Sequence, residues 1–136
     1  MFMIRNSQMD IFQESLEERF VERTAHRIRE ADPLDAEGID DVSLKAMVKK
    51  GIARARSHQL SWESSITGFV YLMFTVAPDF GDRPAFRQIL DNVSIEDENR
   101  RMDVLFERIG EEEWEEARLR GDRAAWSRNL AEEGRE

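Results

Sequence analysis

Residues 61–84, SWESSITGFVYLMFTVAPDFGDRP, contain the most apolar stretch of this chain and decide how the rest is arranged. On a helix, the large apolar side chains between Trp62 and Ala77 cover more than half of the circumference, and Glu63 is the only charged residue among them. A helix that is apolar on most sides is buried by neighbouring elements. We therefore predict a central core helix over about residues 61–77. Ser61 is its expected N-cap, and Pro78 ends it.

This stretch is too short to cross a membrane as a helix. Its longest run without a charged residue extends only from Ser64 to Pro78 and contains Ser, Thr and Gly. A membrane-spanning helix needs about 20 predominantly apolar residues. The sequence therefore predicts a buried core helix and no membrane partner.

The N-terminal region predicts a long helix over about residues 7–30. One apolar stripe repeats at a spacing of three and four residues and is formed by Met9, Phe12, Leu16 and Phe20. The remaining positions are densely charged, and opposite charges three or four residues apart stabilise a helix. His26 falls on the polar side, so we expect a solvated histidine there and not a metal ligand or a catalytic base.

A second helix, about residues 43–57, is sharply amphipathic. Its apolar face contains Gly51, which predicts close packing against another helix, because a glycine in mid-helix costs about 1 kcal/mol relative to alanine. Its other face is basic and includes Lys45, Lys49 and Arg56. Two interpretations of this basic face stay open: a match to the acidic C-terminal half of the chain, or the binding of an external acidic partner.

The loop after the central helix combines turn-forming residues with one large aromatic side chain, Phe80. Phe80 either folds back over the core as a plug or is exposed, beside Asp79, as an anchor for a partner. Trp114 and Trp126 have two similar interpretations. Each one caps the helical bundle or contributes to a partner site, where tryptophan is enriched.

The C-terminal part of the chain predicts several short helices. They cover about residues 84–92, 95–109 and 111–120, and a last one contains Trp126 and Leu130. Pro84 suits the first position of the earliest of them. Ser94 and Asp97 resemble a capping box at the start of the next, and Gly110 is its expected C-cap.

Together these segments predict an all-α fold. We expect a single compact bundle of about five to six helices around the central helix, forming one domain over residues 1–136 with a frayed C-terminal end. A central helix this apolar is covered either by its own chain or by a second copy. The sequence therefore leaves a homodimer open.

Composition argues against several classes of function. The 136 residues include no cysteine, which removes thiol catalysis, disulfides and thiolate zinc sites and fits a cytoplasmic protein. The start, MFMIRNSQMD, lacks the pattern of a secretion signal. The formal net charge is −9, and residues 91–136 hold 15 acidic and 8 basic side chains, so nucleic-acid binding is disfavoured. No HExxH, P-loop, GxSxG or dinucleotide motif is found, and we predict no enzyme, cofactor or metal.

Four stretches of the chain together match a pattern of known proteins. They are Ile4-Arg5 with Gln8-Met9 and Phe12, Gly51-Ile52-Ala53-Arg54-Ala55-Arg56, Leu72-Met73-Phe74 with Pro78-Asp79-Phe80, and Arg101-Met102 with Leu105-Phe106. These stretches resemble a family of small helical proteins encoded in effector operons of bacterial type VI secretion systems. The chain departs from the family pattern at Ala77 and Gly81, where relatives often have glycine and aspartate. The part beyond Gly110 has no counterpart in that pattern.

The resemblance implies a cytoplasmic accessory protein, a chaperone, co-chaperone or adaptor that helps to deliver a toxin to the secretion spike. The implied partners are proteins: an adaptor, the effector toxin or a spike component. We expect the partner surface to include Asp79 and Phe80 together with the basic face formed by Lys45, Lys49 and Arg56. The alternatives are an immunity protein that occludes a cognate toxin, and a toxin or other enzyme of unrecognised type.

Overall fold

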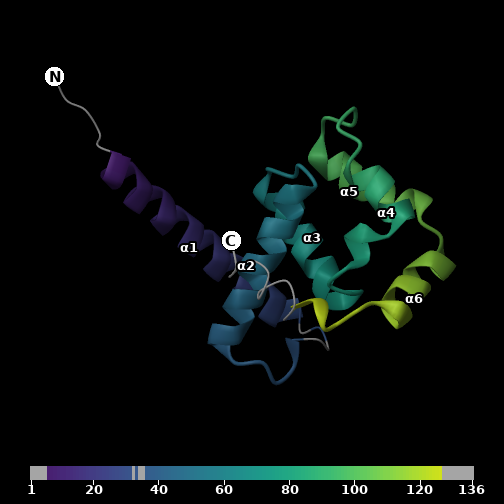
Figure 1. The fold of residues 1–136 in the computed structure, drawn as a ribbon, viewed down its shortest axis with the longest axis horizontal. Helices are drawn as coiled ribbons and strands as arrows, with labels where there is room; N and C mark the ends of the chain where they lie inside the picture. The colour runs from purple at the N-terminus through teal and green to yellow at the C-terminus, as the bar shows by residue number, and fades with distance from the viewer. Residues whose placement is uncertain (1–5, 32, 34–35, 127–136) are drawn as a thin grey trace.

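The fold, seen in a computed structural model that describes residues 6–31, 33 and 36–126, is built from helices alone. The helices are α1 (Asn6–Ala31), α2 (Asp41–Ser57), α3 (Glu63–Thr75), the short 3₁₀ helix η2 (Phe80–Asp82), α4 (Pro84–Leu90), α5 (Glu98–Arg108) and α6 (Glu111–Arg120). The described residues contain no β-strand, which confirms the predicted all-α bundle (Figure 1). None of the described helices is long and apolar enough to cross a membrane.

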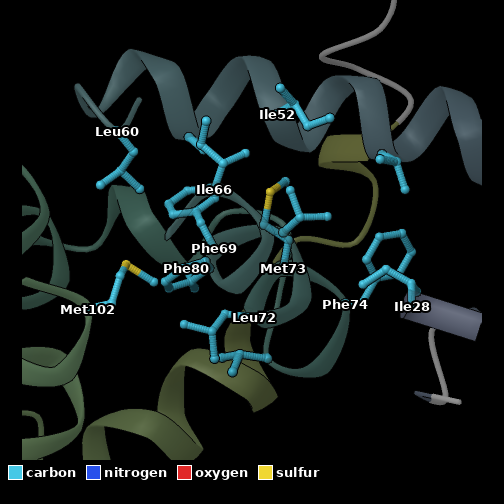
Figure 2. Packing of buried hydrophobic residues seen from close by; sticks show 14 of the residues in the cluster. Ile28, Ile52, Leu60, Ile66, Phe69, Leu72, Met73, Phe74, Phe80 and Met102 are labelled. Carbon is cyan, nitrogen blue, oxygen red and sulfur yellow. The ribbon is translucent and has the colours of Figure 1, made fainter. Parts of the chain in front are cut away.

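Helix α3 is the central helix that the sequence predicts, and the chain itself covers it. It contacts α1, α2 and α5. Phe69, Met73 and Phe74 are each at most 1% exposed, and they lie within the cluster of buried side chains in Figure 2. At Gly51 of α2, an added Cβ would lie 3.0 Å from a methyl carbon of Val70. The predicted close packing at this glycine is therefore confirmed, and α3 is the partner helix.

The predicted N-cap of α3 is wrong, because a carboxylate from another helix satisfies this end. The N-cap position is Trp62, whose side chain makes no capping hydrogen bond. Glu98 of α5 instead accepts hydrogen bonds from the backbone N–H groups of Ser61 (2.7 Å) and Trp62 (2.8 Å). The hydroxyls of Ser61 and Ser65 also donate to Glu98, each at 2.7 Å. Glu98 thus takes up donors that the first turn of a helix leaves without intrahelical partners.

This arrangement strongly favours the ionised form of Glu98. Burial raises the pKa of its carboxyl group, but the hydrogen bonds from Trp62, Ser61 and Ser65 lower it more, to about 2. The residue is 6% exposed. Glu98 therefore stays a carboxylate inside the protein and joins the start of α3 to the start of α5.

The segment that follows α3 decides between the two interpretations of Phe80. The helix ends at Thr75, and the chain continues through Pro78 into η2, as the proline predicts. Phe80 is fully buried and packs against Phe69 and Phe86, with ring centroids 4.9 and 5.8 Å away. The plug is confirmed, and the exposed anchor is wrong.

Two helix ends in the C-terminal part differ from the prediction by a few residues. Asp97 is itself the N-cap of α5 and accepts from the N–H of Arg100 at 3.0 Å, so the helix begins at Glu98 and not near residue 95. Gly110 is the N-cap of α6 and not the C-cap of α5, which is Ile109. Helix α6 itself coincides with the predicted residues 111–120. Leu130 of the last predicted helix lies outside the described residues.

A buried arginine holds the connections around α5 together. Arg101 is only 3% exposed. Its guanidinium group donates to the backbone carbonyl groups of Ile95 (3.1 Å) and Leu90 (3.1 Å). Nearby, His58 is also buried, and its Nδ1 lies 2.8 Å from a carboxylate oxygen of Asp91. Burial raises the pKa of Asp91, but the contact with His58 contributes to a net lowering. These groups fix the ends of α2 and α4 against the start of α5.

Candidate protein-binding surface

Helix α1 consists of two parts with different surroundings. Its C-terminal part packs on the bundle through buried side chains, namely Phe20, Val21, Ala25 and Ile28. Residues 8–16, by contrast, are all exposed. Figure 1 shows this N-terminal part of α1 extending away from the other helices. The described part of the chain therefore leaves about two and a half turns of α1 uncovered.

One face of the uncovered part is apolar. Met9, Phe12 and Leu16 are 38%, 59% and 46% exposed and follow one another at spacings of three and four residues, so they form one stripe. We call these three residues the α1 stripe. The sequence predicts this stripe together with Phe20, but only Phe20 reaches the core. Ile11 is 67% exposed and lies on the opposite side of the helix.

A groove continues the α1 stripe into the bundle. It has a volume of about 440 Å³ and lies where α1, the end of α2 and the start of α3 meet. Leu16, Phe20 and Ile66 supply its apolar lining. Its remaining lining residues are Gln13, Glu17, Arg56, Ser61 and Glu63. We call it the α1 groove, and Leu16 belongs to both the stripe and the groove.

The side of α1 that faces α2 is mostly acidic. An open hollow of about 700 Å³ lies between the two helices and is lined by Asp10, Gln13, Glu14, Glu17, Glu18, Lys49 and Arg56. No lysine or arginine occurs between residues 6 and 18. Within the described chain, the ion pairs of α1 begin at Glu17, so Asp10 and Glu14 face solvent without a basic counterpart.

The predicted basic face of α2 has its counterpart on α1. Lys45 lies 3.8 Å from Glu22, and Lys49 lies 3.0 Å from Glu18. The guanidinium group of Arg56 donates to both carboxylate oxygens of Glu17 at 3.0 and 3.1 Å. These three basic residues and three acidic residues run antiparallel along the two helices. The predicted pairing with the acidic C-terminal half of the chain is thus wrong for Lys45, Lys49 and Arg56.

These ion pairs are exposed, and exposed pairs contribute little to stability one by one. Their effect is geometric, because three pairs in a row, the last of them bidentate, hold the direction of α1 on α2. An external acidic partner of Lys45, Lys49 and Arg56 would have to displace the carboxylates of α1.

The other predicted partner residues are used inside the fold. Asp79 is half-buried and accepts a hydrogen bond from the backbone N–H of Asp122 at 3.1 Å. Trp114 is half-buried and stacks on Phe106, with ring centroids 5.3 Å apart. Trp126 is 7% exposed and packs on Phe74 at 4.9 Å. Both tryptophans therefore cap the bundle, as one of the two interpretations predicts.

The described residues show no candidate metal site. No group of three or more histidine, aspartate or glutamate side chains in residues 6–31, 33 and 36–126 is placed to hold a metal ion. His26 is exposed, as the sequence predicts, and its Nε2 lies 2.7 Å from a carboxylate oxygen of Glu30. The α1 stripe and the α1 groove are thus the candidate functional site.

Comparison of the chain with protein-family models, with curated proteins and with solved structures gives no significant match.

Proposed function

We propose that this protein is a non-catalytic, protein-binding accessory factor of a type VI secretion system. It acts in the cytoplasm as a chaperone, co-chaperone or adaptor and assists the loading of an effector. The resemblance of residues 4–106 to small helical proteins of effector operons supports the class of partner.

One structural observation carries the protein-binding part of the proposal: the α1 stripe is exposed on a helix that extends beyond the bundle. A contiguous exposed apolar surface with a polar rim is typical of interaction sites. An isolated helix of this length is marginal in water, so the uncovered turns gain stability when a partner packs on them. Partners that fit the resemblance are an adaptor, the effector toxin or a spike component.

The test is a pull-down with tagged protein from the native organism, followed by mass spectrometry. The wild type is expected to recover an adaptor together with spike components, with or without the toxin. Recovery of a single toxin in an equimolar complex without activity would overturn the accessory role and establish an immunity protein. Recovery of none of these proteins would overturn the secretion role altogether.

A further inference from the structure

A second hollow adjoins the α1 groove between α1 and α3. It has a volume of about 310 Å³, and Phe20 and Glu63 line both hollows. Its other lining residues carry guanidinium or hydroxyl groups; they are Arg23, Thr24 and Arg27 of α1, and Ser64 and Thr67 of α3. We call it the α1–α3 hollow. Helical spacing agrees with this grouping, because residues 20, 23, 24 and 27 fall within an arc of about 100° on α1.

Arg27 lines this hollow without a carboxylate partner in the described chain. Arg23, by contrast, donates to Glu63 at 3.0 Å. Glu30 lies one turn after Arg27, but its carboxylate is 2.7 Å from Nε2 of His26. Two arginines and one glutamate therefore line the hollow, which gives its lining a formal charge of +1 on a protein with a net charge of −9. A guanidinium group binds a carboxylate through two parallel hydrogen bonds.

Thr24 supplies a second unused donor at the same turn of α1. The residue is 1% exposed and lines the hollow, and its hydroxyl group makes no hydrogen bond. Buried hydroxyl groups are normally hydrogen-bonded, because a missing bond costs about 1–3 kcal/mol. Thr24 and Arg27 are three residues apart and thus neighbours on the helix surface. Together they provide the donors that one oxyanion needs.

The adjoining α1 groove specifies the second property of an occupant. Leu16, Phe20 and Ile66 supply its apolar lining. From Phe20 to Arg27 the helix rises by about 10 Å, and an extended peptide covers this length in about three residues. A short segment with an acidic residue about three positions from a large apolar residue therefore matches both hollows.

The chain's own C-terminal segment is a poorer match. Residues 127–136 follow Trp126, which packs on Phe74 near the end of α3, whereas the α1–α3 hollow lies at the first turns of α3. Its neighbouring glutamates, Glu132 and Glu133, stand between Arg128 and Arg135, and these arginines oppose binding to Arg27. A second copy of the chain carries a net charge of −9 as well, so two copies repel each other as a whole.

We propose that the α1–α3 hollow and the α1 groove bind a short acidic segment of a different protein. A carboxylate of that segment accepts hydrogen bonds from Arg27 and Thr24, and an apolar side chain of the segment packs on Leu16, Phe20 and Ile66. This inference rests on the proposed function, because it names the site by which the accessory factor holds its protein partner.

The test is an NMR titration of the ¹⁵N-labelled full chain with three synthetic peptides. The first has one leucine and, three positions later, two glutamates in a background of serine and glycine. The second has glutamine in place of each glutamate, and the third has serine in place of the leucine. The first is expected to bind about fivefold more tightly than either of the others. The backbone signals of Arg27 and Thr67 should shift on binding.

Three variants of the full chain assign the binding to this site. Arg27→Gln keeps a good helix former and removes the charge, and it should weaken binding of the first peptide about fivefold. Thr24→Val should also weaken binding without a loss of stability, since it removes a hydroxyl group that the fold does not use. Arg19→Gln is the matched control, because Arg19 is also exposed and without an ion pair in the described chain but lines neither hollow. Circular dichroism checks helix content.

Several results would overturn the inference. They are equal binding of the glutamate and glutamine peptides, absence of binding at millimolar peptide, or an equal effect of Arg27→Gln and Arg19→Gln. Tighter peptide binding by the double variant Glu132→Gln with Glu133→Gln would make the C-terminal segment the occupant. A wild-type dimer that dissociates in Arg27→Gln, measured by light scattering, would make a second copy the occupant.

The pull-down separates this inference from the proposed function. If Arg27→Gln recovers secretion proteins as well as the wild type does, the binding site is wrong while the proposed function stands. If the peptide binds through Arg27 but the wild type recovers no secretion protein, the acidic-segment site stands and the secretion role is wrong.

Discussion

The carboxylate of Glu98 makes a sharp prediction about stability and its dependence on pH. The pKa of Glu98 is lowered from 4.5 to about 2 in the folded protein, because the hydrogen bonds at the start of α3 outweigh the effect of burial. A carboxyl pKa that is lower by about 2.5 in the folded than in the unfolded state corresponds to a contribution of about 3 kcal/mol to the free energy of unfolding. Total stabilities of domains are about 5–15 kcal/mol, so this one group accounts for a large share.

We expect the Glu98→Gln variant to unfold with a free energy about 3 kcal/mol lower than the wild type at pH 7. Glutamine keeps the shape and one acceptor oxygen and replaces the other, which accepts from the hydroxyl of Ser61, by an amide donor, so the variant removes the charge together with one acceptor. The folded-state pKa is lowered, and the contribution is therefore fully present above the unfolded-state value of 4.5. It declines as the pH falls towards 2. At pH 3, the difference between wild type and variant should be less than half of its value at pH 7.

Urea unfolding followed by circular dichroism at pH 7, 5 and 3 measures this difference directly. The matched control is Glu107→Gln, which removes an exposed carboxylate of the same helix that pairs with Arg100. This control should change stability much less, since exposed ion pairs contribute little. The reasoning would be refuted by a Glu98→Gln effect that is as small as the control, or by a difference that does not change between pH 7 and pH 3.

Three further variants test the packing. Phe80→Ala should lower the free energy of unfolding by about 3–5 kcal/mol, because it empties a fully buried ring site, whereas Phe12→Ala should change it little; urea unfolding compares the two. Gly51→Leu should cost about 1–3 kcal/mol through overpacking against α3, and Ala53→Leu on the exposed side of α2 is its control in thermal melts. Arg101→Lys should cost about 1–3 kcal/mol, because one ammonium group leaves buried carbonyl groups without donors. Unchanged melting of this variant would contradict the structural role of Arg101.

Local patterns in the sequence predict most of the helices and the identity of the central one. The start of α6 after Gly110 is predictable, because Trp114 falls out of phase with the apolar stripe of the preceding helix and thereby indicates a new helix. The packing of Gly51 is also predictable, since a glycine on an apolar helix face has a steric reason to be there. These features depend only on residues within a few turns of one another.

The features that local sequence patterns do not predict depend on contacts between distant residues. The capping of α3 by Glu98 joins groups 36 and 37 residues apart, and nothing near Glu98 in the sequence marks it. Periodicity identifies the α1 stripe as apolar, but it does not show which part of the stripe finds a partner within the chain. The exposed and buried parts of α1 have the same spacing and similar residues.

The ion pairs between α1 and α2 are a case where a usable signal exists. Along α1 the acidic residues follow in the order Glu17, Glu18 and Glu22. Their partners on α2 follow in the reverse order along the chain, as Arg56, Lys49 and Lys45. This order is what two antiparallel neighbouring helices require. Helices that follow each other along the chain are usually neighbours in space. The sequence therefore favours a pairing of the basic face of α2 with α1 over a pairing with the acidic C-terminal half.

The position of Glu98 also has a consequence for the order in which the chain folds during its synthesis. The ribosome releases residues 61–75 well before residue 98, so the newly made α3 first has free amide groups at its start. The plug residue Phe80 and the buried Arg101 also follow α3 in the chain. A nascent chain that stops before residue 98 therefore exposes its most apolar helix without its cap. Completion of the core has to wait until α5 has left the ribosome.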